Sequence, residues 1–90
     1  PVTEIGASAF SSKTGITSVV IPDSVTKIGS AAFADCANLT NVVIGENVTT
    51  IDYAAFGGTN LESVVIPASV TTIGEMAFYN CSRKIGGYCM

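Results

Sequence analysis

The chain has 90 residues, a length that allows a single domain at most. It is 48% hydrophobic and only 12% charged, and it carries a formal net charge of −3. Its 4 basic residues argue against nucleic acid as a partner, because neutralising phosphates needs several Lys or Arg side chains on one face. No apolar stretch approaches the roughly 20 residues that span a bilayer. The absence of histidine excludes Ser-His-Asp and Cys-His catalysis and most zinc sites.

A block with the pattern Ile-x-x-x-Ala-Phe returns along the whole chain. Its phenylalanines are Phe10, Phe33, Phe56 and Phe78, at spacings of 23, 23 and 22 residues. A fixed period of this length predicts one supersecondary unit stacked on copies of itself. We therefore predict a repeat solenoid of about 3.5 repeats over residues 1–83, with the four rings stacked roughly 5 Å apart. The pattern then fades, so residues 84–90 are expected to form an irregular tail or partial cap.

The first predicted element of each full repeat is a β-rich segment that reads aliphatic-x-x-Val-Val-Ile. The three segments are residues 16–21, 39–44 and 61–66. Alternation along a strand places the first valine and the isoleucine on one face and leaves Val20, Val43 and Val65 on the other. Proline or glycine follows each segment, so each strand is expected to end there. We expect short parallel strands, one per coil, that form a sheet along the solenoid.

Two further elements follow each of these strands. A Val-Thr-x-Ile stretch is expected to be extended and to form a second, shorter strand or bridge. The block that ends in Ala-Phe pairs small residues with a bulky ring, and we predict one tight helical turn that places the phenylalanine in the core. The third junction is one residue shorter, and the deletion falls in residues 57–60, where two glycines can absorb it.

The chain has three cysteines, Cys36, Cys81 and Cys89, and no C-x-x-C motif. Cys36 and Cys81 lie two coils apart, which is about 10 Å at strand spacing and beyond the ~7 Å limit for disulfide Cα atoms. We therefore expect these two not to pair, and Cys36 to be a small, half-buried packing residue. Cys81 and Cys89 could close a small loop in an oxidising compartment, or Cys89 could pair between molecules.

The recurring positions form a recognisable pattern. One repeat runs Leu-Thr-Asn-Val-Val-Ile-Gly over residues 39–45, Val-Thr-Thr-Ile over 48–51 and Ala-Ala-Phe over 54–56. This pattern resembles the BspA-like leucine-rich repeat of the 23-residue type, as do Cys36 and Cys81, each three residues after a phenylalanine. The resemblance covers about residues 2–83. Two departures stand out: Asp52 replaces the expected glycine, and the chain holds fewer than four repeats.

The resemblance implies a fold and a general role. The fold is a right-handed solenoid whose Val-Val-Ile strands line a concave sheet, with tight helical or 3-10 turns and short extended segments on the convex side. The role is adhesion or protein binding at the cell surface or outside the cell. Because such proteins usually carry many repeats, we expect the chain to be part of a longer repeat protein.

The outward positions of the concave strands are the best candidates for a binding surface, because a contiguous apolar stripe often marks an interaction site. They are Thr17, Ser18, Val20, Thr40, Asn41, Val43, Glu62, Ser63 and Val65. The alternative is that the β-branched valines only stabilise the strands. We expect no catalytic, cofactor or metal site, because the acidic residues are dispersed and no calcium-binding loop motif occurs.

These observations favour a non-catalytic interaction or adhesion module that binds a protein partner through the concave sheet, and neither nucleic acid nor a membrane. The alternative is a structural segment that self-assembles end to end, because open solenoid ends expose unpaired strands and apolar side chains. An enzyme is a distant third, because the sequence has no histidine and no cluster of metal-ligand residues, and a short solenoid is not expected to enclose a pocket.

Overall fold

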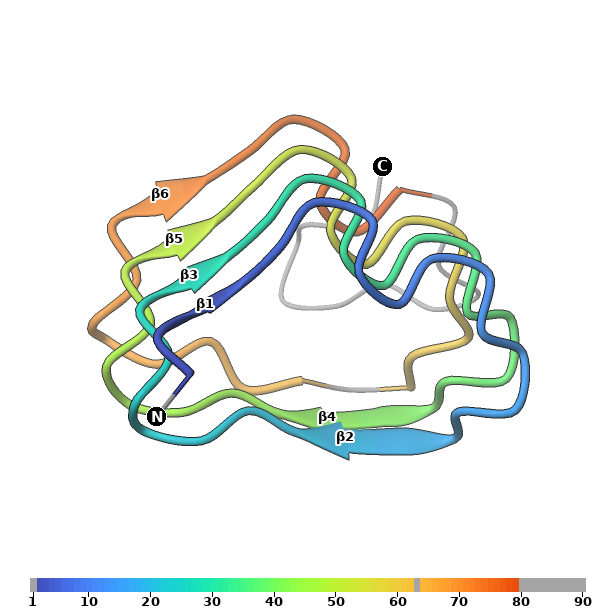
Figure 1. Ribbon diagram of the computed structural model, residues 1–90, viewed down its shortest axis with the longest axis horizontal. Helices are drawn as coiled ribbons and strands as arrows, with labels where there is room; N and C mark the ends of the chain where they lie inside the picture. Colours follow the sequence, from blue (N-terminus) through green and yellow to red (C-terminus); the bar gives the residue numbers. More distant parts are fainter. Residues whose placement is uncertain (1, 63, 80–90) are drawn as a thin grey trace.

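In the computed structural model, which describes residues 2–62 and 64–79, the chain winds through successive coils that lie on one another (Figure 1). We number them coil 1 (residues 2–24), coil 2 (25–47), coil 3 (48–69) and coil 4 (70–79). The strands are β1 (Glu4–Ile5), β2 (Ser18–Val20), β3 (Lys27–Ile28), β4 (Asn41–Val43), β5 (Thr50–Ile51) and β6 (Thr72–Ile73). Strands β1, β3, β5 and β6 form one parallel sheet in that order, and β2 pairs with β4 in another. The two sheets lie along different sides of the coil (Figure 1).

Equivalent residues of successive coils are paired directly, as a repeat of this period predicts. Ile5 pairs with Ile28, Ile28 with Ile51, and Ile51 with Ile73. The phenylalanine rings stack in the same order, with centroids 5.3, 5.3 and 5.6 Å apart and ring planes at most 9° from parallel. Both findings confirm the predicted stacking of coils around a column of rings.

The interior is one apolar core built from equivalent positions of each coil. Its largest fully buried side chains include Phe33, Phe56, Phe78, Ile28, Leu39, Ile51 and Leu61. Cys36 is fully buried rather than half-buried, and its Sγ donates a hydrogen bond to Phe10 O at 3.0 Å. Phe10 itself is 41% exposed, because no part of the described chain covers its outer side. This ring, predicted to lie in the core, is therefore covered on one side only by the described residues.

The alternation of inward and outward side chains in the Val-Val-Ile strands β2 and β4 is as predicted. On β4, Val42 is buried while Val43 is 51% exposed, and Ile44, just beyond the strand, is buried again. Val20 of β2 points outward in the same way. The shorter second strands also form, and they build the larger of the two sheets. Each Val-Thr-x-Ile stretch of coils 2 to 4 ends in one of its strands.

The third predicted strand, over residues 61–66, does not form: none of its described residues lies in a strand. The prediction was wrong although the sequence repeats Val-Val-Ile there. The segment begins in register, because Glu62 N–H donates to Thr40 O just as Thr40 N–H donates to Thr17 O one coil earlier. From Val64 onward the ladder is not continued, since no backbone hydrogen bond among the described residues joins residues 64–66 to β4 or Ile44.

The Ala-Phe blocks are not helical, which corrects the predicted tight helical turns. The described residues contain no helix, and each block is a succession of β-turns closed by i→i+3 hydrogen bonds, such as Ala32 N to Gly29 O at 3.1 Å. Two positions in the blocks of coils 1 to 3, and one in the described part of the coil 4 block, adopt positive φ, with values from 53° to 72°. They are Ser8, Ala31, Ala54 and Met76 at the first position, and Ser12, Asp35 and Gly58 at the second. A residue in this left-handed region cannot continue a right-handed helix.

Hydrogen bonds between coils explain why turns form instead of a helix. Alternate N–H groups in the blocks of coils 1 to 3 donate to carbonyls of the next coil, as Ala31 N does to Tyr53 O and Phe33 N to Ala55 O, both at 2.8 Å. In a helix these donors would be used within the block. The same bonds join coil 1 to coil 2 and coil 3 to coil 4, so this turn ladder is continuous through the stack.

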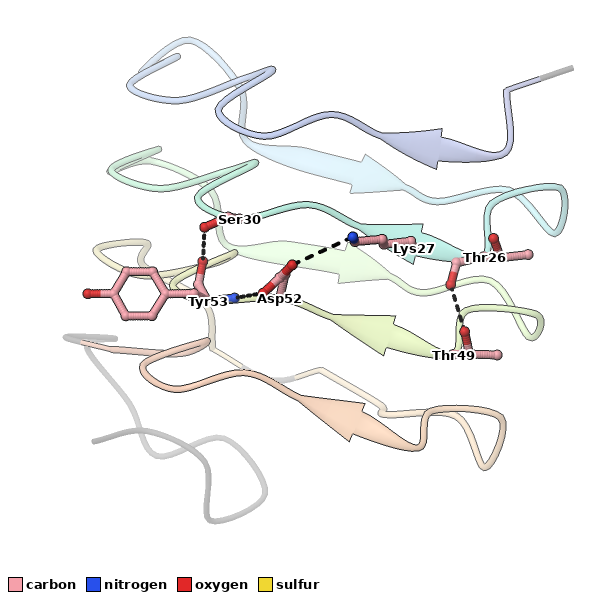
Figure 2. A network of polar contacts seen from close by, with 6 residues as sticks. All are labelled: Thr26, Lys27, Ser30, Thr49, Asp52 and Tyr53. Carbon is pink, nitrogen blue, oxygen red and sulfur yellow. Dashed lines mark hydrogen bonds and ion pairs between the residues drawn. The ribbon is translucent and has the colours of Figure 1, made fainter.

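Asp52 stands where the other coils have glycine, and the turn accommodates it (Figure 2). The turn bond is kept, with Ala55 N donating to Asp52 O at 3.2 Å. The carboxylate accepts a hydrogen bond from Tyr53 N at 2.7 Å through Oδ1 and lies 3.8 Å from Lys27 Nζ through Oδ2. Ser30 Oγ also donates to Tyr53 O at 3.3 Å. The substitution therefore adds side-chain contacts while the backbone hydrogen bond of the turn stays in place.

A column of threonines ties the coils together beside the larger sheet. Thr26 Oγ1 donates to Thr3 O at 3.2 Å, Thr49 Oγ1 to Thr26 O at 3.1 Å (Figure 2), and Thr71 Oγ1 to Thr49 O at 3.3 Å. These threonines are exposed, so each bond replaces one to water and contributes on the order of 1 kcal/mol or less.

Candidate functional site

Eight of the nine predicted binding residues are described, and Ser63 lies outside the described residues. Thr17, Ser18, Asn41 and Glu62 are exposed, and Thr40 is half-buried. The outward valines Val20, Val43 and Val65 are 72%, 51% and 81% exposed. The eight side chains are therefore at least partly accessible to a partner.

The structure brings the predicted residues of coils 1 and 2 together but leaves those of coil 3 outside the sheet. Ser18 pairs with Asn41 and Val20 with Val43 across β2 and β4. Val65 belongs to the segment that does not join this sheet. The paired valine stripe is thus two coils long. Thr40 is engaged within the molecule, because its Oγ1 donates to the carbonyl of the preceding coil at 3.2 Å.

A pocket of about 410 Å³ opens between coils 2 and 3, where the third strand was predicted. It is lined by residues 41–44, Glu46, Val64, Val65, Pro67 and Ala68. This pocket could not be predicted from the sequence, because both coils carry the same Val-Val-Ile motif. The nearby deletion in residues 57–60 is no signal for it, because the bond from Glu62 N to Thr40 O shows that the register is restored before the motif.

A second hollow, of about 420 Å³, lies at the open end of coil 1. Its lining is almost entirely apolar and includes Val2, Ile5, Phe10, Ile16 and Val19. No other coil of the described residues covers this side of coil 1, so its apolar side chains are accessible there.

Both hollows offer apolar contacts and backbone groups. Among residues 2–62 and 64–79, no three His, Cys, Asp or Glu side chains gather where they could hold a metal ion. The one described cysteine, Cys36, is buried beneath the backbone of coil 1. In the same residues no helix has the length and apolar character needed to cross a bilayer.

Comparisons with known proteins agree with this architecture. A family model described as "BspA type Leucine rich repeat region (6 copies)" matches residues 2–85. The chain is similar to a leucine-rich repeat protein from Bacteroides capillosus ATCC 29799, with a TM-score of 0.77, 34% identity, and coverage of 100% of this chain and 64% of that one. It is also similar to one from Bacteroides ovatus ATCC 8483, with a TM-score of 0.67, 29% identity, and coverage of 93% and 28%. A search of curated proteins found no significant match.

The chain thus spans 64% and 28% of the lengths of these two solved relatives. Proteins built from such repeats commonly mediate protein interaction and are generally not enzymes. The matched region contains all the stacked phenylalanines and both sheets. The chain belongs to the BspA-type leucine-rich repeat family.

Proposed function

We propose that the chain is a non-catalytic interaction module that binds a protein partner through the outward side of β2 and β4. The observation that carries this proposal is the pair Val20 and Val43, which lie side by side across the two strands and are 72% and 51% exposed. Exposed apolar stripes rimmed by polar side chains are typical of interaction sites. The parallel pairing holds the two side chains in place before a partner arrives, which lowers the entropy cost of binding.

The family supports further parts of the proposal. They are an adhesive role, a location outside the cell or at its surface, and a right-handed winding in which this side of the coil is concave. The greater length of the solved relatives supports a place within a longer repeat protein. We place the solenoid over residues 1–83 and a tail or cap over 84–90, beyond the described residues.

The test compares two variants that add the same charge to exposed strand positions. Val43→Asp lies on the proposed surface, and Thr72→Asp lies on β6 of the other sheet as its matched control. Each protein is immobilised and used to capture labelled cell-surface proteins, after circular dichroism has shown that it is folded. We expect the wild type and Thr72→Asp to retain the same partners and Val43→Asp to lose them. Equal retention by all three would contradict the proposed surface.

A second candidate function, end-to-end self-association, is favoured by the apolar hollow at coil 1. Phe10 is 41% exposed there, whereas the equivalent rings of coils 2 to 4 are at most 2% exposed. Covering this end with another coil would remove apolar surface from water, at roughly 25 cal/mol per Å². Sedimentation velocity at several concentrations tests the idea. Ile5→Asp should shift the protein to smaller species, and an Ile5→Asp profile identical to that of the wild type would refute it.

A further inference from the structure

Coils 2 and 3 are closely packed except at one side. Their rings, Phe33 and Phe56, stack at 5.3 Å, and β3 pairs with β5. Hydrogen bonds between successive windings also lie on both flanks of the pocket. Before it, Glu62 N of coil 3 donates to Thr40 O of coil 2 at 3.3 Å; after it, Ser69 Oγ at the end of coil 3 donates to Val48 O at the start of the same coil at 2.8 Å. The opening between these flanks is therefore a local feature of an otherwise closed junction.

Within this opening, β4 has one edge that pairs with no strand among residues 2–62 and 64–79. On the other edge, Ile21 N of coil 1 donates to Val43 O at 2.8 Å. The equivalent donor one coil later is Ile44 N, and no backbone hydrogen bond joins it to residues 64–66 of the described chain. An unpaired strand edge is a template for another extended chain, because its N–H and C=O groups are already aligned.

The side chains around this edge define what would fit. The pocket of about 410 Å³ is walled by apolar side chains from both coils, and Val65 on the far wall is 81% exposed. Glu46 lies at the rim with an exposed side chain. Among the described residues, no Lys or Arg lines the pocket. The surroundings therefore match an extended segment with small apolar side chains at alternate positions and a basic residue beside Glu46.

We propose that the free edge of β4 binds an extended segment of another protein as an added β-strand, with valine- or isoleucine-like side chains directed into the pocket and a basic side chain at Glu46. The inference rests on the proposed interaction function, and names the form in which a partner is bound. This inference differs from the proposed interaction surface in the part of β4 that contacts the partner, which is the backbone edge of the strand rather than its outward side chains. About three residues of the segment would pair, because β4 is three residues long and a strand advances about 3.3 Å per residue.

The test uses a synthetic peptide with the sequence of residues 16–21 between two added lysines, because that sequence contains β2, the strand that pairs with the other edge of β4. Two control peptides carry N-methyl groups on one or the other alternate set of backbone nitrogens. We expect one methylated set to weaken binding about tenfold or more and the other less than about threefold, since only one set of N–H groups faces β4. Equal binding of all three peptides, or binding by none, would overturn the proposal.

Amide hydrogen exchange locates the contact, with Ile21 as the matched control for Ile44. In the free protein the Ile44 amide should exchange at least about tenfold faster than that of Ile21, and saturation with the peptide should remove the difference. An Ile44 amide that is already as protected as Ile21 would mean that residues 64–66 close the edge themselves, and would sink the proposal. So would an Ile44 amide that the peptide leaves unchanged.

Charge variants complete the design. Glu46→Gln should weaken peptide binding about two- to fivefold at low salt, while Glu4→Gln on β1 should leave it unchanged. If Glu46→Gln and Glu4→Gln changed the peptide affinity equally, a contact between Glu46 and a basic residue of the partner would be refuted. Failure of the face and failure of the edge are distinguishable. Partner capture that is insensitive to Val43→Asp contradicts the face alone, and peptide binding that is insensitive to methylation contradicts the edge alone.

Discussion

The left-handed turns provide a quantitative test of the fold through the substitution Ala31→Gly. Ala31 has a φ of 56°, a region that costs an L-residue about 1–2 kcal/mol. Glycine avoids this cost but loses about 0.5–1 kcal/mol more backbone entropy on folding than alanine. The difference predicts a net stabilisation of about 0.5–1 kcal/mol, which for a domain of this size raises the Tm by roughly 2–8 °C.

The matched control is Ala34→Gly in the same block. Ala34 is half-buried like Ala31, but its φ is not positive. It should therefore show only the entropy loss, a destabilisation of about 0.5–1 kcal/mol. Thermal and urea unfolding followed by circular dichroism measure both variants against the wild type. If both glycines destabilise the protein equally, the block is a helical turn and the reasoning from left-handed residues is refuted.

Three further predictions concern packing and charge. Gly29→Ala should destabilise the protein by about 1–3 kcal/mol in urea unfolding, because the added Cβ would lie 2.6 Å from a carbonyl oxygen of coil 1. Gly6→Ala is the control: its added Cβ would have nothing within 4 Å, so stability should change by less than about 0.5 kcal/mol. Phe56→Ala should cost about 3–5 kcal/mol, and Phe10→Ala clearly less in the same assay, because Phe10 is 41% exposed and stacks on one side only. Lys27→Met should alter stability by less than about 0.5 kcal/mol at any salt concentration, since the ion pair spans 3.8 Å between side chains 45% and 40% exposed.

The stacked architecture could be predicted from the sequence because many positions recur together. A period shared by Ile28 and Ile51 and by the phenylalanines leaves little freedom in how the coils align, and the pairings found are those that the period implies. The alternation at Val42 and Val43 was equally readable, because one face of the strand is buried. Both the stacking of the coils and the alternation along the strands depend on the sequence separation of equivalent residues, which can be read from a single sequence.

The turn geometry could not be predicted, because the local sequence points to another structure. Residues 30–34 contain alanines and no glycine, which favours a helix by intrinsic propensity. The competing influence is not local: Ala31 N and Phe33 N donate to carbonyls of coil 3. Only a count of hydrogen bonds between coils shows that these donors have better partners outside their own block.

The candidate binding site was predicted in part for a related reason. Val20 and Val43 could be placed on one surface from the motif alone, whereas the separation of Val65 from that surface could not. The motif around Val65 is complete, and the segment begins in register, with Glu62 N donating to Thr40 O. Whether the strand then forms depends on backbone hydrogen bonds to the neighbouring coil, which the residues of the motif do not encode.

The uneven distribution of hydrogen bonds explains how the stack can leave one edge free. The turn ladder and the larger sheet both run through coils 1 to 4, whereas the smaller sheet ends at β4. Each hydrogen bond missing beside β4 forgoes about 1 kcal/mol or less, while the ring column and two ladders still hold the coils together. The side that contributes least to cohesion is therefore the side where a partner's strand can add hydrogen bonds without displacing any that the described residues make. Because binding there requires the folded stack, a bound segment would also stabilise the protein in proportion to the logarithm of its concentration above Kd.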